Sequence, residues 1–270
     1  MGTNSADVCP ACDGTGWIVF LKDCRDVYGG NEPVMISYAK RCTFCNGTAA
    51  AAEVRQRKAT LPQAFYDTDL TYFKWDIYRD DRGMPFDMTD QRKLVESFVK
   101  DFDEWAAQGL GLYIWSAMSG SGKTFLASAI TNTLIKKKRI KAKFVPVSEL
   151  ISMEKNDYGD PIKDLCETDL LVLDDLGATQ ANQWLNDILF RILDKRDQKR
   201  PTIVTSNVKI ANLTFDKRVI GRLDANMQNI PFPDYCVRSH NAKERRREML
   251  KALGLMKQKP EAQQMVLEAR

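Results

Sequence analysis

Short, continuous hydrophobic runs recur along most of the chain. They are typical of β-strands, and the run Leu-Leu-Val-Leu is typical of a parallel strand that is covered on both faces. The runs lie at residues 112–115, 143–147, 170–173 and 202–205.

Between these runs, apolar residues return at helical spacing. The pattern predicts helices over residues 89–108 and 124–138, and Gly109 has the position of a helix C-cap. A further apolar stripe begins at Trp184 and ends at Leu193. Alternating strands and helices predict an α/β fold, in which a parallel sheet is flanked by helices.

Cysteine usage divides the chain into parts. Most of the seven cysteines lie within the first 45 residues. We therefore expect a small module over residues 1–48 and a linking segment over residues 49–88. The main domain, with a C-terminal helix, is expected over residues 89–270.

The N-terminal cysteines form two C-x-x-C pairs. They are Cys9, Cys12, Cys42 and Cys45. Two such turns supply four soft ligands for a tetrahedral zinc ion, and apolar residues at 17–21 and 34–38 predict a β-hairpin between them, as in a zinc ribbon. The alternatives are unligated thiols, one redox pair or an iron–sulfur cluster, and Cys24 is expected to be a spare thiol.

Overall composition excludes several classes of protein. The 270 residues are 44% hydrophobic, which excludes wholesale disorder. No apolar run is long enough to cross a membrane, and the polar start of the chain has no secretory signal. We expect a cytoplasmic protein with no membrane partner. A single histidine excludes a two-histidine metal site within one chain.

A glycine-rich loop follows the predicted strand at 112–115 and opens the next helix. It reads Ser119-Gly120-Ser121-Gly122-Lys123-Thr124. Backbone N–H groups of such a loop surround a phosphate, the lysine reaches the β- and γ-phosphates, and the threonine hydroxyl is a ligand of Mg²⁺. The first position of the usual pattern is Ala117 instead of glycine.

The predicted strand at 170–173 ends in Asp174 and Asp175. Asp174 has the position of a residue that holds Mg²⁺, and Asp175 is the candidate base that orients the attacking water. Aspartate is one methylene shorter than the glutamate that is common there, so we expect slow hydrolysis. The alternative interpretation is a turn at the end of the strand.

Polar residues after the next strand complete the candidate site. Asn207 follows the run at 202–205 and is positioned to contact the γ-phosphate or the water. Arg218 and Arg222 share one helix face, from which an arginine could reach a neighbouring subunit's nucleotide. The alternative for both arginines is a solvated helix face.

In this order, these motifs resemble an AAA+ ATPase, and more closely the DnaC/DnaI-type helicase loaders and their IstB-like relatives. The resemblance lies in residues 170–178 and 200–207, and the paired C-x-x-C motifs are similar to the zinc module of DnaI-type loaders. It implies that Arg222 is a trans-acting arginine finger, that Arg218 is its companion, and that Arg238 acts on the nucleotide as a second sensor.

The resemblance also implies a function. We expect an ATP-dependent replicative helicase loader that binds single-stranded DNA, self-associates into a ring or spiral, and recruits a DnaB-type helicase through its N-terminal module. Its cofactors would be ATP, Mg²⁺ and Zn²⁺. The alternatives are an IstB-like regulator that directs a transposase, and a nucleotide-gated adaptor with negligible hydrolysis.

Two basic clusters are candidates for contact with DNA phosphates. The first spans residues 136–143, and the second is Arg245-Arg246-Arg247. A cationic run at a helix C-terminus also interacts favourably with the helix dipole, so a merely solvated surface is the alternative. By family position, residues 148–158 form another candidate DNA-facing segment.

Overall fold

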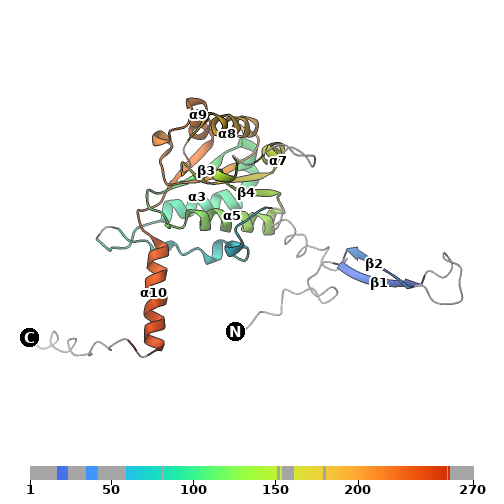
Figure 1. Ribbon diagram of the computed structural model, residues 1–270, viewed down its shortest axis with the longest axis horizontal. Helices are drawn as coiled ribbons and strands as arrows, with labels where there is room; N and C mark the ends of the chain where they lie inside the picture. Colours follow the sequence, from blue (N-terminus) through green and yellow to red (C-terminus); the bar gives the residue numbers. More distant parts are fainter. Residues whose placement is uncertain are drawn as a thin grey trace, which may run out of the picture.

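The structure is a computed structural model (Figure 1). It describes residues 17–23, 35–41, 59–80, 82–150, 153, 161–178, 181–253 and 255. Cys24 and the four cysteines of the predicted zinc site lie outside these ranges.

The main domain is built on a five-stranded parallel sheet with the order β4-β5-β6-β3-β7. The strands are β3 (Gly111–Trp115), β4 (Ala142–Pro146), β5 (Leu170–Leu176), β6 (Thr202–Ser206) and β7 (Met227–Pro231). The predicted parallel α/β sheet is therefore confirmed. Strand β7 was not expected, because the polar Gln228 and Asn229 interrupt its apolar pattern; it pairs only with β3, at an edge of the sheet.

Helices connect these strands. They are α3 (Thr89–Lys100), α4 (Phe102–Gln108), α5 (Lys123–Lys138), α6 (Val147–Leu150), α7 (Pro161–Glu167), α8 (Gln183–Arg196), α9 (Lys217–Asn226) and α10 (Val237–Ala252). Short 3-10 turns are η1 (Gln63–Phe65), η2 (Leu70–Tyr72), η3 (Trp75–Ile77) and η4 (Ile210–Asn212).

The sheet separates two hydrophobic cores. Helices α3 and α5 lie on one face, and α7, α8 and α9 lie on the other (Figure 1). Alternation along β3 supplies both cores, because Leu112 and Ile114 pack with the first and Tyr113 packs with the second. All three side chains are fully buried.

Two details differ from the predicted helices. The helix expected over residues 89–108 is divided at Asp101, whose φ of −105° and ψ of 34° are not helical. The break turns Phe102 into the core, against the ring of Phe98. Gly109 ends α4 with a φ of 64°, as predicted for a C-cap. Trp184 is 53% exposed, so it does not belong to the buried stripe of α8.

The segment that precedes α3 packs closely on the domain. The backbone N–H of Phe144, in β4, donates to the carbonyl of Ala59 at 2.7 Å. Asn132, buried in α5, donates from Nδ2 to the carbonyls of Phe65 at 2.7 Å and Thr68 at 2.8 Å. These bonds attach Ala59 to β4, and residues 65–68 to the helix that begins at the glycine-rich loop.

The N-terminal part contains the expected hairpin. Strands β1 (Trp17–Asp23) and β2 (Met35–Arg41) pair antiparallel, and the register places Trp17 opposite Arg41. At the other end of the chain, α10 projects from the domain and has no buried residue (Figure 1). None of the described helices is both long and apolar enough to cross a membrane.

Candidate functional site

The glycine-rich loop joins the carboxyl end of β3 to the first turn of α5. Gly120 has a φ of 75° and Gly122 a φ of 99°, a region that only glycine enters without strain. Gly122 is the N-cap of α5, where free N–H groups and the helix dipole favour an anion. A Cβ on Gly122 would also lie 3.1 Å from Tyr78 Oη, so the loop has no space for a side chain there.

Lys123 is held inside this loop. Its ammonium donates to the carbonyl of Met118 at 3.0 Å, to the carbonyl of Ser116 at 3.4 Å and to Oγ of the buried Ser121 at 3.1 Å. Burial lowers the pKa of Lys123, while the nearby carboxylates of Asp175 and Asp174 act in the opposite direction. The lysine therefore lies between the loop and the acidic end of β5.

Asp174 meets the first turn of α5 from the end of β5. Its Oδ2 accepts from Thr124 Oγ1 at 3.3 Å, and its Oδ1 accepts from Thr205 Oγ1, in β6, at 2.6 Å. Burial raises the pKa of Asp174, and Asp175 adds to the rise, whereas the hydrogen bonds from Thr205 and Thr124 lower it. A threonine hydroxyl and a carboxylate are oxygen donors of the kind that Mg²⁺ prefers, so this pair fits the predicted magnesium site.

Asp175 lies at a bulge in the same strand. The pairing of β5 with β6 shifts between Leu173 and Leu176, and Asp175 has a φ of 58°. Its backbone N–H donates to Thr205 Oγ1 at 2.9 Å, and its side chain is exposed. A non-glycine residue in the left-handed region is strained, and such strain gathers at functional sites. At this bulge the carboxylate of Asp174 is buried, whereas that of Asp175 is exposed.

Asn207 follows β6, which is the neighbour of β5 in the sheet. Its Oδ1 is buried and has no hydrogen-bond partner among the residues that the structure describes. Buried acceptors in proteins nearly always have a donor, so this oxygen has the capacity to accept from a water molecule or a ligand.

Arg238 begins α10 against the loop. Its backbone N–H donates to the carbonyl of Gly120 at 3.1 Å. A Cβ on Gly120 would lie 3.1 Å from Arg238 Cβ and 3.1 Å from Cys236 Sγ. The structure thus brings Arg238 next to the predicted phosphate loop, from more than a hundred residues away in sequence.

The structure places Arg218 and Arg222 elsewhere, between α9 and α8. Arg222 forms ion pairs with Asp194, at 2.7 Å, and with Asp197. Arg218 pairs with Asp216 at 3.1 Å and lies 4.8 Å from the ring centre of Phe190. The side chain of Arg222 is 37% exposed and that of Arg218 is 51% exposed. Both arginines therefore lie at the surface and not beside their own chain's loop.

Sequence reasoning missed three residues of the site. Tyr78 Oη donates to the carbonyl of Ser121 at 2.9 Å, and Asp234 accepts from Ser116 at 3.1 Å; Thr205 bridges Asp174 and Asp175. Tyr78 and Asp234 lie far from the loop in sequence and outside any motif. Thr205 could have been found, because it occupies the strand next to β5 just before Asn207.

The four predicted zinc ligands lie outside the described residues, so the structure does not place them. Within the ranges that it does describe, no group of three or more histidine, cysteine, aspartate or glutamate side chains could hold a metal ion.

A phosphate loop between β3 and α5, with an acidic strand end beside it on a parallel sheet, defines the class of P-loop nucleotide-binding proteins of the AAA+ type. Residues 87–220 of the chain match the family described as IstB-like ATP binding protein.

Two named relatives also match about half of the chain. The replicative helicase loader DnaI of Bacillus subtilis (strain 168) is 32% identical over 146 residues, 48% of this chain and 46% of that protein. The replicative helicase loader DnaC of Escherichia coli (strain K12) is 28% identical over 139 residues, 48% of this chain and 55% of that protein. The match thus spans about half the length of each curated relative.

A solved structure of DnaI has the same fold. It aligns with a TM-score of 0.53 and 23% sequence identity, and the alignment covers 64% of this chain and 95% of that one.

Proposed function

We propose that the chain is an ATP-dependent replicative helicase loader, which binds single-stranded DNA and recruits a DnaB-type helicase. Two findings carry this proposal: residues 87–220, which contain the nucleotide site, match the IstB-like ATP binding family, and two curated replicative helicase loaders match about half of the chain. The proposed assembly is a ring or spiral of copies of the chain.

The loop and β5 would bind ATP together. N–H groups of the loop at Gly120–Gly122 surround the phosphates, and the ammonium of Lys123 neutralises their charge. Thr124 and Asp174 would hold Mg²⁺, which supplies positive charge at the transferring phosphoryl group.

Asp175 and Asn207 would act on the attacking water. The exposed carboxylate of Asp175 orients it and takes its proton, and the buried Oδ1 of Asn207 accepts a hydrogen bond from it. The bulge at Asp175 supports this role, because it separates the exposed carboxylate of Asp175 from the buried carboxylate of Asp174.

Arg222 would complete the site of a neighbouring copy. Its exposure on α9, away from its own loop, is what a trans-acting arginine finger requires. Arg218 would assist it from one turn earlier. Arg238, beside Gly120, would sense the nucleotide in its own copy and pass that state to α10.

The N-terminal module would be a zinc ribbon that contacts the helicase. The register of the hairpin supports this, since Arg41, directly before Cys42, lies opposite Trp17, and the first C-x-x-C pair ends a few residues before Trp17. Elemental analysis of the purified chain tests it: one zinc per chain is expected, and a chain without bound metal would contradict it.

Turnover of ATP by the purified chain tests the enzymatic part of the proposal. Asp175→Asn should lower the rate by roughly 100-fold or more, because a general base contributes at least that much. Binding of a fluorescent ATP analogue should persist. A wild-type chain that binds ATP and never hydrolyses it would favour a nucleotide-gated adaptor instead.

The family description keeps one alternative in place, an IstB-like regulator that directs a transposase on DNA. A transposase gene beside this one, and retention of that transposase by the purified chain, would favour this second function. Retention of a replicative helicase favours the first.

A further inference from the structure

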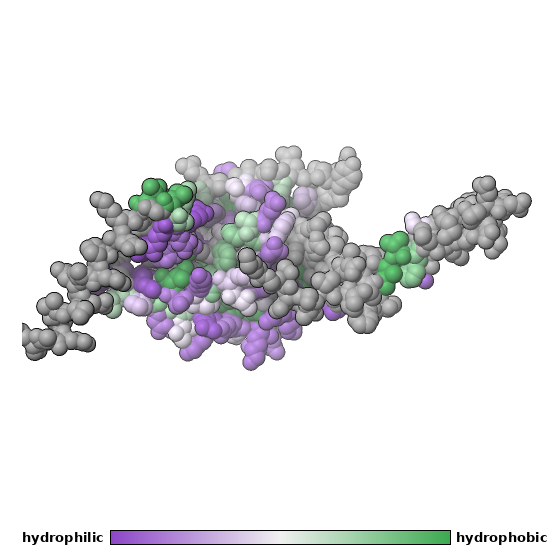
Figure 2. Space-filling model, turned by 90° about the horizontal axis from the view of Figure 1, so that it is seen from below, coloured by the Kyte–Doolittle hydropathy of each residue, from purple (hydrophilic) through white to green (hydrophobic). Residues whose placement is uncertain are grey.

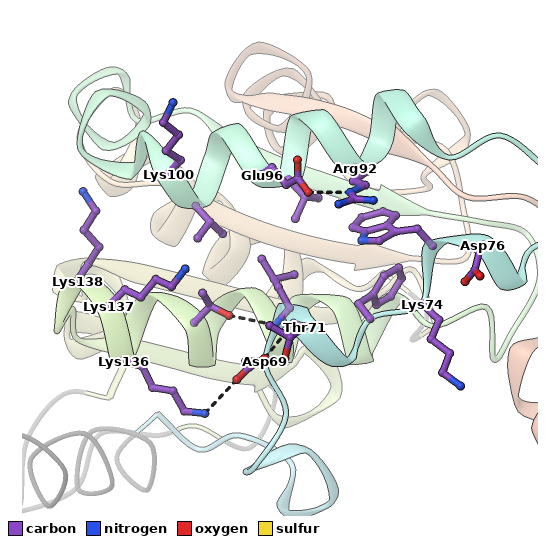
Figure 3. A pocket seen from close by; sticks show the side chains of 16 residues that line it. Asp69, Thr71, Lys74, Asp76, Arg92, Glu96, Lys100, Lys136, Lys137 and Lys138 are labelled. Atoms are coloured by element: carbon purple, nitrogen blue, oxygen red, sulfur yellow. Dashed lines mark hydrogen bonds and ion pairs between the residues drawn. The ribbon is translucent and has the colours of Figure 1, made fainter. Parts of the chain in front are cut away.

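A groove of about 980 Å³ lies between α3, the end of α5 and the turns η2 and η3 (Figure 3). Lys137 lies in the last turn of α5, whereas Lys123 begins it. At 1.5 Å per residue, the two positions are about 20 Å apart along the helix. The lysine-rich end of the groove is therefore distant from the P-loop, whereas Phe73, which also lines the groove, would lie 3.8 Å from a Cβ on Gly122.

Cations dominate the rim of this groove. They are Lys74, Arg92, Lys100, Lys136, Lys137 and Lys138, against the carboxylates of Asp69, Asp76 and Glu96.

Three of the six cations already have partners. Arg92 pairs with Glu96 at 2.7 Å, Lys136 with Asp69 at 3.5 Å, and Lys138 with Asp103, outside the groove, at 2.6 Å.

The other three lysines are available to a ligand. Among the described residues, no carboxylate lies within ion-pair distance of Lys74, Lys100 or Lys137. Lys100, Lys137 and Lys138 gather at one end of the groove, and Lys74 lies with Asp76 at the other (Figure 3). A chain of negative charges laid along the groove would meet positive charge at both ends.

The floor of the groove is formed by apolar side chains. Phe73, Val95 and Val99 are buried in the core beneath it, whereas Leu70 and Trp75 are only partly buried and leave apolar surface in the groove. Trp75 is only partly buried, and its ring lies 4.5 Å from that of Phe73, which holds it in place. In the view from below, hydrophilic side chains cover most of the described surface (Figure 2).

We propose that this groove binds single-stranded nucleic acid. Lys74, Lys100 and Lys137 contact backbone phosphates, and one base stacks on Trp75. A cationic groove with an anchored aromatic ring is the common design of surfaces that bind single strands. The six cations of the rim favour a polyanion over an amphipathic peptide, which would meet apolar surface at Leu70 and Trp75. The inference rests on the proposed DNA-binding function and assigns a surface to it.

Salt dependence of binding tests the lysines. The full-length chain is titrated with fluorescein-labelled oligo(dT) and oligo(rU), with ATP present, and anisotropy is followed over a range of salt concentrations. For single strands, each lost phosphate contact reduces the slope of log affinity against log salt by about 0.7. Lys100→Ala and Lys137→Ala should each show this loss. Lys93→Ala is the matched control, because Lys93 is exposed on α3 and does not line the groove.

Tryptophan emission tests the stacking. Oligo(dT) should quench part of the emission of the wild-type chain, and Trp75→Phe should remove that quenching while it retains most of the affinity. Trp75→Leu should weaken binding by roughly tenfold, as stacked bases contribute about 1–3 kcal/mol each. Circular dichroism shows whether each variant is folded.

Three distinct outcomes would overturn the assignment. Oligonucleotide binding with an unchanged salt slope in both lysine variants would move the site elsewhere and leave the proposed function intact. No binding of either oligonucleotide in any nucleotide state would remove the DNA-binding part of the proposed function as well. A glutamate-rich peptide that binds in their place, and is lost in Lys137→Ala, would identify an acidic protein partner instead.

Discussion

Asp174 is a buried carboxylate beside a second carboxylate, and two threonine hydroxyls hold it. Burial and Asp175 together outweigh those hydrogen bonds, so its pKa is raised above the usual 3.8. A carboxyl group with a higher pKa in the folded chain holds its proton more tightly there. Its contribution to stability is therefore present below the unfolded pKa and is lost as the pH rises through the folded pKa.

Asp174→Asn should therefore stabilise the chain in the absence of nucleotide. At neutral pH the variant avoids an unfavourable buried charge, and an amide can keep both threonine contacts. We expect the free energy of unfolding to rise, because burial and Asp175 disfavour the charged form of this carboxyl group. Urea unfolding between pH 4 and pH 7 measures it.

The same variant, although more stable, should lose its response to ATP with Mg²⁺. Stabilisation by ATP with Mg²⁺ should disappear in Asp174→Asn, because an amide is a weaker metal ligand than a carboxylate. Asp224→Asn, at an exposed position of α9, is the control and should change neither property. A variant that is less stable than wild type at neutral pH, or that ATP stabilises fully, would contradict the assignment.

At the scale of elements, α8 is joined to the sheet through a buried arginine. Arg196 is 2% exposed, and its guanidinium donates to the carbonyls of Leu165 and Thr168 at 2.8 Å, of Pro201 at 2.6 Å, and to Thr202 Oγ1 at 2.9 Å. These acceptors belong to the end of α7, the turn before β5, and the start of β6. One side chain thus holds the base of the sheet, opposite the nucleotide site.

Replacement of Arg196 should lower the free energy of unfolding much more than replacement of the neighbouring Lys195. Arg196→Met leaves several buried carbonyls without donors, so we expect the free energy of unfolding to fall by about 3 kcal/mol or more. Lys195→Met, exposed on the same helix, should change it by about 0.5 kcal/mol or less. Equal effects in chemical denaturation would show that the arginine contacts are not needed for stability.

Sequence patterns predicted those strands and loops that are determined by residues close together in the chain. The continuous apolar runs gave four of the five strands, and the spacing in Ser119–Thr124 gave the phosphate loop, because these features depend on neighbouring residues. Strand β7 has only two buried side chains and needs β3 beside it. The anchoring roles of Tyr78 and Arg196 depend on backbone groups far away in sequence, which no motif contains.

At the scale of the whole molecule, Arg222 is half-exposed and tied to α8. Ion pairs at the surface contribute about 1 kcal/mol or less, so the pairs with Asp194 and Asp197 would not prevent the arginine from turning toward a neighbour. Its proposed role in trans requires that two copies share one site.

A mixing experiment tests this sharing. Lys123→Ala should bind ATP poorly, and Arg222→Ala should bind ATP but hydrolyse it slowly. A mixture should recover part of the activity, because the intact P-loop of one variant meets the arginine of the other. Lys123→Ala mixed with the double variant is the control without recovery. If the first mixture stays as inactive as its components, Arg222 does not act in trans.

The central claim is that a nucleotide-driven chain recruits a replicative helicase. It is tested most directly when the full chain is immobilised and the replicative helicase of its source is passed over it, with and without ATP. We predict that the wild-type chain retains the helicase, and that ATP changes the amount retained in the wild type but not in Lys123→Ala. Retention of no helicase in either nucleotide state would contradict the account.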